Sequence, residues 1–439
     1  FRAMRGLREV VRLASSMASR TPAKRVIDTK PSIWVEFTTL AADCKAVNLG
    51  QGFPDSGMPP FVAAHLAEVA AHPERTDLHQ YTRGYGHPAL VSVLAKLYSR
   101  LYQVPVDANN QIVVTVGAYL ALYYAFLGWI DHGDEVIIME PAYDCYSPQV
   151  KFAGGVPVPV SMPLAPPARS SSHYILDLDA VRAAITPKTK MLVLNNPHNP
   201  TGKLFKRAEL EGLATLAKEH DLIVIADEVY EWHVYDGAEM IRFASLPGMY
   251  ERTISIGSAG KAFSATGWKL GWAVGPEALL NPIKAVHQNC VFTCSTPTQH
   301  AVAQAFEREL AIIDSDPKSS YLLHGLSSEL AARRDRLAAM LSSAGFTPII
   351  PDSGYFMMAG FSAIHGPFEE AGPDPLDFRF TRWLCREKKL AAIPPSAFYS
   401  EQFKKENEYL IRLCFFKSDE TLSKAEVILQ QLAAECGKK

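Results

Sequence analysis

The feature that most constrains the fold is an alternation of short β-branched runs with helical patterns between about residues 110 and 300. The expected strands are Ile112–Val116, Val136–Met139, Lys190–Leu194, Leu222–Ala226 and Thr253–Ile256. Helical stretches such as Arg207–Glu219 separate them. This alternation predicts an α/β fold with a largely parallel sheet covered by helices on both faces. In such sheets ligands bind at the carboxyl ends of the strands.

Beyond residue 310 the pattern changes, and at 439 residues two domains are expected. A helical stretch at Ser327–Ser343 is followed by expected strands at Gly354–Met358 and Leu410–Phe416 and by a final helix. The segment Val47–Gly52 is expected to pack with this part, which makes the smaller α+β domain discontinuous. We therefore predict an N-terminal arm at 1–38, a small domain at 39–64 and 312–439, and a large domain at 65–311.

Bulk properties exclude several classes of partner. The formal net charge is −2, from 44 basic and 46 acidic residues, so no basic surplus favours nucleic acid binding. The seven cysteines lack zinc-site spacing, and we expect reduced thiols and no metal site. The uncharged stretch Ile112–Ile130 has the length of a membrane helix. A strand, a break at Gly117 and a helix from Ala118 explain it better, so no membrane association is expected.

The first twenty residues carry five arginines, three serines and a single acidic residue, Glu9. This composition is typical of a mitochondrial presequence, and it also suits a disordered basic tail. A mitochondrial location is therefore expected, with a cytoplasmic location as the alternative.

Unusual residues follow four of the expected strands, and the carboxyl ends of parallel strands share one edge of a sheet. The segments are Gly117–Tyr119, Asn195–Gly202, Asp227–Tyr230 and Gly257–Lys261. Lys261 lies among small residues, with a hydroxyl at Ser258 and a second cation at Lys269. A desolvated lysine is a nucleophilic amine suited to a Schiff base, so the sequence predicts pyridoxal 5'-phosphate on Lys261.

The other strand-end residues supply what this cofactor needs. Asp227 suits the pyridine nitrogen, Tyr230 and Asn199 the ring oxygen, and Tyr143 the ring face. The expected phosphate ligands are Ser258, Lys269, Gly117 and Ala118, the last two at a helix N-terminus. Taken alone, each has a commoner structural explanation, such as a helix N-cap for Asp227 or an Asx turn for Asn199.

Arg412 lies inside the apolar run Leu410–Phe416, where an unpaired guanidinium would be costly. Its partner is either an internal carboxylate or the carboxylate of a substrate held by two parallel hydrogen bonds.

Together these residues resemble the fold-type I, class I aminotransferases over roughly residues 30–435. The resemblance is strongest to the branch of kynurenine aminotransferases, glutamine transaminase K and cysteine-S-conjugate β-lyases. The motifs that carry it are Trp34–Phe37, Val47–Asp55, Gln80–Arg83, Asp144–Tyr146, Leu246–Met249, Ser258–Trp268 and Ile411–Arg412. It implies a large domain with a mainly parallel seven-stranded sheet flanked by helices.

The resemblance also assigns site residues and partners. It makes Lys261 the Schiff-base lysine and places Arg412, Gly52 and Asn199 at the substrate carboxylate. It implies a homodimer with shared active sites, in which Tyr81 and Phe292 reach the neighbouring subunit's site. Trp34 and Tyr119 would line the side-chain pocket. Two positions depart from close relatives: Thr293, where histidine is expected, and Tyr143, where phenylalanine is common.

The implied reaction is ping-pong transamination between an amino acid and a 2-oxo acid. Kynurenine, which would yield kynurenic acid, glutamine and other large neutral or aromatic amino acids are the expected donors. β-Elimination from cysteine S-conjugates starts from the same carbanion and stays an alternative. A nucleotide-binding dehydrogenase is disfavoured, because no Gly-x-Gly-x-x-Gly follows an early strand. A non-catalytic relative would be expected to lack the lysine, the aspartate or the arginine.

Overall fold

The computed structural model describes residues 22–27 and 32–436. Two compact units are distinguished, residues 1–32 and residues 33–439. The first contributes the short helix α2 (Lys24–Ile27). The residues that favour a mitochondrial location lie outside the described part, so that expectation stays untested.

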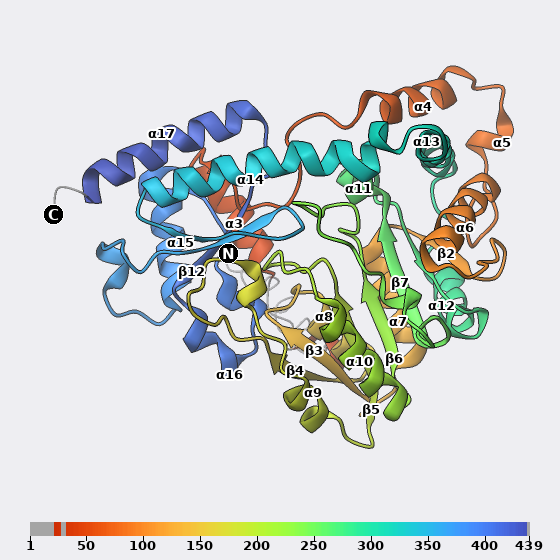
Figure 1. Ribbon diagram of the computed structural model, residues 1–439, viewed down its shortest axis with the longest axis horizontal. Coiled ribbons are helices and arrows are strands. Elements are labelled where there is room, and N and C mark those ends of the chain that lie inside the picture. Colours follow the sequence, from red (N-terminus) through yellow and green to blue (C-terminus); the bar gives the residue numbers. More distant parts are fainter. Residues whose placement is uncertain (1–21, 28–31, 437–439) are drawn as a thin grey trace, which may run out of the picture. The chain divides into compact units, whose positions relative to one another are not determined.

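A seven-stranded sheet forms the centre of the second unit (Figure 1), with the strand order β2-β8-β7-β6-β5-β3-β4. Its strands are β2 (Ile112–Thr115), β3 (Glu135–Glu140), β4 (Val156–Ser161), β5 (Thr189–Asn195), β6 (Ile223–Asp227), β7 (Thr253–Ser258) and β8 (Gly271–Val274). β8 runs antiparallel to both of its neighbours, and the remaining pairs are parallel. The expected α/β class with a mainly parallel seven-stranded sheet is therefore confirmed.

Helices cover this sheet on both faces, because alternate side chains of each strand enter different cores. Val136 and Ile138 pack in the larger core, whereas Ile137 and Met139 pack in the smaller one. Residues of α6 (Pro88–Tyr102), α7 (Ala118–Trp129), α12 (Glu277–Cys290) and α13 (Thr296–Ser315) belong to the larger core. Residues of α9 (Leu178–Ala184) and α10 (Arg207–Glu219) belong to the smaller core.

The stretch considered as a membrane span divides as expected into the strand β2 and the helix α7. Within the described ranges, no helix combines the length and apolar character needed to cross a bilayer.

Three strands from the C-terminal part form a second sheet with the order β12-β10-β9. They are β9 (Thr347–Ile349), β10 (Phe356–Gly360) and β12 (Leu410–Cys414), all antiparallel to their neighbours. The helices of this part are α14 (Leu326–Ser343), α15 (Leu376–Lys388), α16 (Glu401–Lys404) and α17 (Asp419–Cys436). Figure 1 shows α14 and α17 side by side.

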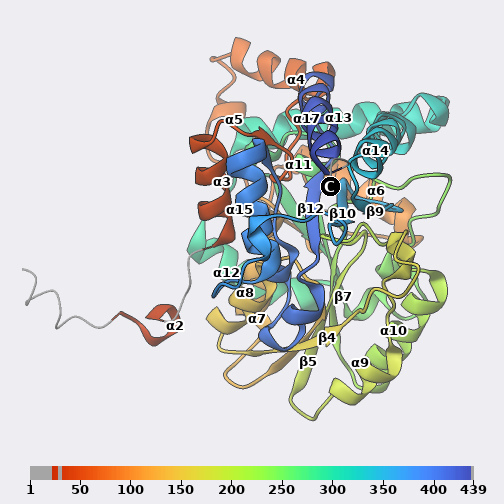
Figure 2. The same cartoon turned by 90° about the vertical axis from the view of Figure 1, so that its left-hand side faces the viewer.

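The early segment joins this C-terminal part, as expected. The strand β1 (Val47–Asn48) pairs in parallel with β11 (Leu390–Ala391), and α3 (Ile33–Asp43) lies beside α15 (Figure 2). The chain then enters the helices α4 (Pro60–Ala71) and α5 (Thr76–His79). The predicted boundaries of the large and small domains stay a prediction.

Candidate active site

One cavity of about 530 Å³ collects most of the residues that the sequence singled out. Those that line it are Trp34, Gly52, Gly117, Ala118, Tyr119, Tyr143, Asn199, Asp227, Tyr230, Ser258, Lys261, Lys269 and Arg412. Tyr81 and Phe292 do not line this cavity. Because the lining residues come from both sheets and from the segment after β1, the site depends on the whole of the second unit.

Lys261 lies on α11 (Ala259–Ala262), a four-residue helix that directly follows β7. Burial, with a smaller contribution from the nearby charge of Arg412, lowers the pKa of this lysine to about 8. Its Nζ atom lies 5.4 Å from the centre of the Tyr230 ring and donates a hydrogen bond to the hydroxyl of Tyr355 at 2.5 Å. At neutral pH a fraction of this amine is therefore neutral and nucleophilic.

Asp227 ends β6 and is 3 % exposed. Its Oδ2 atom accepts a hydrogen bond from Tyr146 at 2.5 Å, whereas its Oδ1 atom has no partner in the described part of the chain. Burial raises the pKa of this carboxyl to about 6. No helix begins here, since residues 229–232 form a turn, so the N-cap explanation does not hold. A buried acid with one unsatisfied oxygen fits a protonated ring nitrogen.

A cluster of cationic and N–H donors faces the start of α7. A Cβ added at Gly117 would lie 3.6 Å from Lys269 Nζ, and Ser258 lines the same cavity. The N–H of Gly117 donates to the carbonyl oxygen of Thr115 at 2.8 Å and is therefore not available to a phosphate. The first free N–H at the N-terminus of α7 is that of Ala118. Lys269, Ser258 and the N-terminus of α7 together fit a phosphate group.

Arg412 lies on β12, is 1 % exposed and has no carboxylate partner in an ion pair within residues 22–27 and 32–436. Its Nη1 atom donates to Asn199 Oδ1 at 3.0 Å and its Nη2 atom to Gly50 O at 3.2 Å, whereas Nε has no partner there. The rings of Phe356 and Trp34 lie 3.9 and 5.1 Å from the guanidinium carbon. The internal-carboxylate alternative is therefore not realised, and donor capacity remains for a substrate carboxylate.

Tyr81 and Phe292 contact each other instead of the cavity. Their ring centroids are 5.6 Å apart in an edge-on arrangement, and they are 84 % and 57 % exposed. Large exposed aromatic side chains of this kind are typical of an interface. Their expected place in a neighbouring subunit's site stays a prediction.

Sequence reasoning missed three residues with polar roles in this region. Tyr146 holds Asp227, Asp144 Oδ2 accepts from Trp34 Nε1 at 2.8 Å, and Tyr355 contacts Lys261. Tyr146 and Asp144 belong to the motif Asp144–Tyr146, which directly follows Tyr143 in the chain, so their position in the sequence could have indicated them. Tyr355 is 94 residues from Lys261 in the chain, and no local pattern connects the two.

This chain is similar to known proteins over most of its length. Residues 45–427 match the family model described as aminotransferase class I and II. Human kynurenine–oxoglutarate transaminase 3 is 46 % identical over 414 residues, which is 93 % of this chain and 90 % of that protein. Human kynurenine–oxoglutarate transaminase 1 is 44 % identical over 430 residues, which is 95 % of this chain and all of that protein.

Solved structures show the same fold. A putative kynurenine aminotransferase from Saccharomyces cerevisiae has a TM-score of 0.87 at 30 % identity, covering 94 % of this chain and 99 % of that one. N-succinyldiaminopimelate aminotransferase from Mycobacterium tuberculosis has a TM-score of 0.83 at 37 % identity, covering 94 % of this chain and all of the other.

Proposed function

Because this chain belongs to the class I and II aminotransferases, we propose that it moves the amino group of L-kynurenine to a 2-oxo acid. Glutamine and other large neutral or aromatic amino acids are further donors in this proposal. The names of relatives about 45 % identical to this chain support kynurenine and oxoglutarate as the substrate pair. The aromatic side chains of Trp34, Tyr119 and Tyr143 around the cavity support a large donor.

One observation carries the proposal. A single cavity holds an amine of lowered pKa, a buried carboxyl with an unsatisfied oxygen and a buried guanidinium with an unsatisfied N–H. The first two fit pyridoxal phosphate, on which this family depends, and the third fits the carboxylate of an amino acid. Asp227, Tyr230, Asn199, Ser258, Lys269, Ala118 and Tyr143 would hold the cofactor.

The bound cofactor supplies a carbonyl for the amino group and a ring that accepts the electron pair left at the α-carbon. Arg412 and Asn199 orient the substrate through its carboxylate. Lys261 Nζ, as a neutral amine, takes the proton from the α-carbon and returns it within the cavity. Asp227 would keep the ring nitrogen of the cofactor protonated, and Tyr146 fixes the orientation of that carboxyl through Oδ2. The donor leaves as a 2-oxo acid, and a second 2-oxo acid is aminated in reverse.

The test combines a spectrum with product analysis. Purified protein with pyridoxal phosphate should change its visible absorbance when L-kynurenine is added, and kynurenic acid should form once 2-oxoglutarate is present. Lys261→Ala should lose both signals. Arg412→Lys should keep the cofactor spectrum but lower kcat/KM for the amino acid by about ten- to a hundredfold, because a point charge replaces the bidentate fork.

Two outcomes would redirect the proposal. Release of pyruvate from a cysteine S-conjugate faster than transamination of kynurenine would make β-elimination the main activity. An unchanged spectrum with kynurenine, together with a change on glutamine, would remove kynurenine from the donors.

The proposal includes a homodimer with shared sites, supported by the exposed pair Tyr81 and Phe292. It also includes a mitochondrial location, which the arginine- and serine-rich composition of the first twenty residues supports.

A further inference from the structure

Tyr355 accepts a hydrogen bond from Lys261 that has no role in the proposed reaction. It directly precedes β10 and is 1 % exposed. Its hydroxyl receives the hydrogen bond from Lys261 Nζ at 2.5 Å and donates to the carbonyl of Gly52 at 2.8 Å. Within the described ranges, no other hydrogen bond of the Lys261 amine is found. Tyr355 therefore links the lysine to the segment that follows β1.

The direction of these hydrogen bonds follows from the protonation of the phenol. Burial holds the pKa of Tyr355 well above its usual range, and the neighbouring hydroxyl of Tyr230 acts in the same direction. The phenol therefore keeps its proton. A phenol has one O–H donor, and the Gly52 carbonyl accepts it. Toward Lys261 the oxygen is then an acceptor, which takes an N–H and leaves the lone pair of a neutral amine free.

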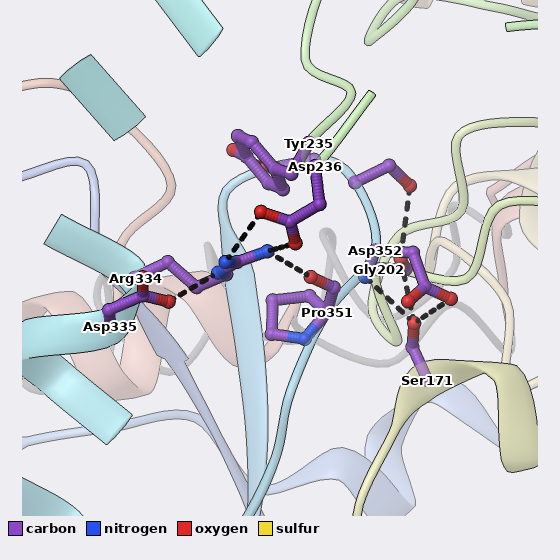
Figure 3. Close-up of polar contacts among 10 residues, drawn as sticks. Ser171, Gly202, Tyr235, Asp236, Arg334, Asp335, Pro351 and Asp352 are labelled. Carbon is purple, nitrogen blue, oxygen red and sulfur yellow. Dashed lines mark hydrogen bonds and ion pairs between the residues drawn. The ribbon is translucent and has the colours of Figure 1, made fainter. Parts of the chain in front are cut away.

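The loop before Tyr355 is held from two sides, so the position of the phenol is well defined. Figure 3 shows Ser171 connected by dashed lines to both Asp352 and Gly202. Ser171 Oγ lies 2.9 Å from Asp352 Oδ2 and 3.1 Å from Gly202 O, and it accepts from the N–H of Asp352 at 2.9 Å. Ser353 Oγ also donates to Gly202 O at 2.9 Å. These bonds tie the loop to the turn that carries Asn199.

The second side of the loop is held by α14. Arg334 donates to Asp236 Oδ2 at 2.7 Å and to the carbonyl of Pro351 at 3.4 Å (Figure 3). The hydroxyl of Tyr235 donates to the carbonyl of Gly354, the residue directly before Tyr355. A phenol fixed in this way offers its oxygen at a constant place relative to Lys261.

We propose that Tyr355 is a positioning residue for Lys261: its hydroxyl receives one N–H of the lysine whenever that amine is free, and thereby directs the amine's lone pair into the cavity. This inference rests on the proposed function. The amine needs a defined position only if Lys261 alternates between being bound to the cofactor and being free. The contact matters twice, when the cofactor is first captured and when Lys261 takes the α-proton.

The test uses Tyr355→Phe, which removes the hydroxyl and keeps the ring. Cofactor-free protein is mixed with pyridoxal phosphate from about pH 6 to about pH 10, and the gain of visible absorbance gives a capture rate at each pH. The oxygen stabilises the charged amine more than the neutral one. In the variant we therefore expect the midpoint of the profile to fall by about half a unit to one unit. We expect the high-pH capture rate to fall by about three- to tenfold, because the neutral amine loses its orientation.

Tyr235→Phe is the matched control. It removes another buried hydroxyl that contacts the same loop from a different segment, one that binds Gly354 and not the lysine. We expect its midpoint and high-pH rate to equal those of the parent protein, because Ser353 and Arg334 still hold the loop. A Tyr355→Phe profile equal to the parent's would overturn the inference, as would equal shifts in both variants, which would indicate a general effect of the loop.

Failure of the proposed function is distinguishable from these results, since the parent protein itself would then gain no absorbance. If Tyr355→Phe does not fold, fluorotyrosine at position 355 keeps the shape of the side chain and weakens the oxygen as an acceptor. A shift of the midpoint in the same direction, but smaller, supports the inference, and no shift refutes it.

Discussion

Two ionisable side chains in the cavity, Lys261 and Asp227, have pKa values shifted in opposite directions by the same cause. Burial disfavours a charge on either of them, which lowers the pKa of the amine to about 8 and raises that of the carboxyl to about 6. In the protein without cofactor, both groups are therefore poorly solvated. A cofactor with an aldehyde and a basic ring nitrogen gives each group a partner and removes this desolvation cost. The cost in the cofactor-free protein therefore favours binding of the cofactor.

The lowered pKa of Lys261 predicts how capture of the cofactor depends on pH. Only the neutral amine attacks an aldehyde, so the capture rate should rise with pH through a midpoint near about 8. An ordinary lysine would give a midpoint near 10.5. Stopped-flow absorbance of the cofactor-free protein measures the profile, and a midpoint near the ordinary value would show that the amine is solvated.

The raised pKa of Asp227 predicts a substitution that stabilises the protein and impairs its function. The folded-state pKa lies above the ordinary aspartate value of 3.8, so the folded state binds the proton more tightly than the unfolded one. The carboxyl therefore costs stability as pH rises from about 4 to about 6, and the full cost persists above that window. Asp227→Asn should raise the free energy of unfolding of the cofactor-free protein at pH 7 by about 2–3 kcal/mol.

Denaturant unfolding of both proteins at pH 7 and at pH 4 measures this effect. The gain should shrink at the lower pH, where the carboxyl is largely protonated in the folded state. The same variant should bind pyridoxal phosphate more weakly and turn over more slowly, because an amide cannot neutralise a protonated ring nitrogen. A variant less stable at pH 7 than the parent would contradict the cost assigned to this buried acid.

At the scale of the elements, neighbouring strands bring the site residues together. Asn195, at the end of β5, is paired with Asp227, and Asp227 with Ile256 two residues before Ser258. This convergence was predictable, because the carboxyl ends of adjacent parallel strands meet at one edge. The strand that completes the phosphate cluster was not predicted. β8 spans only four residues and begins at Gly271, so it offers little pattern to recognise.

A second unpredicted strand, β4, carries prolines at positions 157 and 159. Proline removes a donor from the sheet and therefore argues against a central strand. The observed order resolves the conflict, since β4 is at the edge of the sheet and only β3 pairs with it.

The close approach of β8 to α7 gives a prediction at this scale. A Cβ at Gly271 would lie 2.4 Å from the backbone nitrogen of Ala118, so Gly271→Ala must push the strand away from the helix N-terminus. We expect affinity for pyridoxal phosphate to fall by about tenfold, because the donors of the phosphate site separate. Gly267→Ala is the control, since nothing lies within 4 Å of a Cβ there. Titration of both cofactor-free proteins measures the affinity, and equal values would contradict the expectation.

At the scale of the whole molecule, the exposed aromatic pair Tyr81 and Phe292 has no role within the single chain's cavity. Both were expected to act in the site of a neighbouring subunit, and in the single chain both are exposed and outside the cavity. A closed two-fold dimer would bury both side chains and place each of them beside the cavity of the partner subunit.

Subunit mixing tests this arrangement. Lys261→Ala and Tyr81→Ala homodimers should each have low activity, the second because it lacks an aromatic wall. A mixed dimer holds one site with both the intact lysine and the intact tyrosine. After random exchange, about a quarter of all sites should therefore be complete. Activity that does not exceed the average of the two separate proteins would show that Tyr81 serves its own chain's cavity.

The sequence by itself determined the α/β class, the strand ends that carry Asn199, Asp227 and Lys261, and the family. These follow from local patterns and from motifs whose residues stand close together in the chain. Only the tertiary structure decided which partners the buried groups have: that Arg412 lacks a carboxylate, that Tyr146 holds Asp227, and that Tyr355 holds Lys261. Such contacts join residues separated by 81 to 213 positions, and chain folding, not local pattern, sets the distances between them.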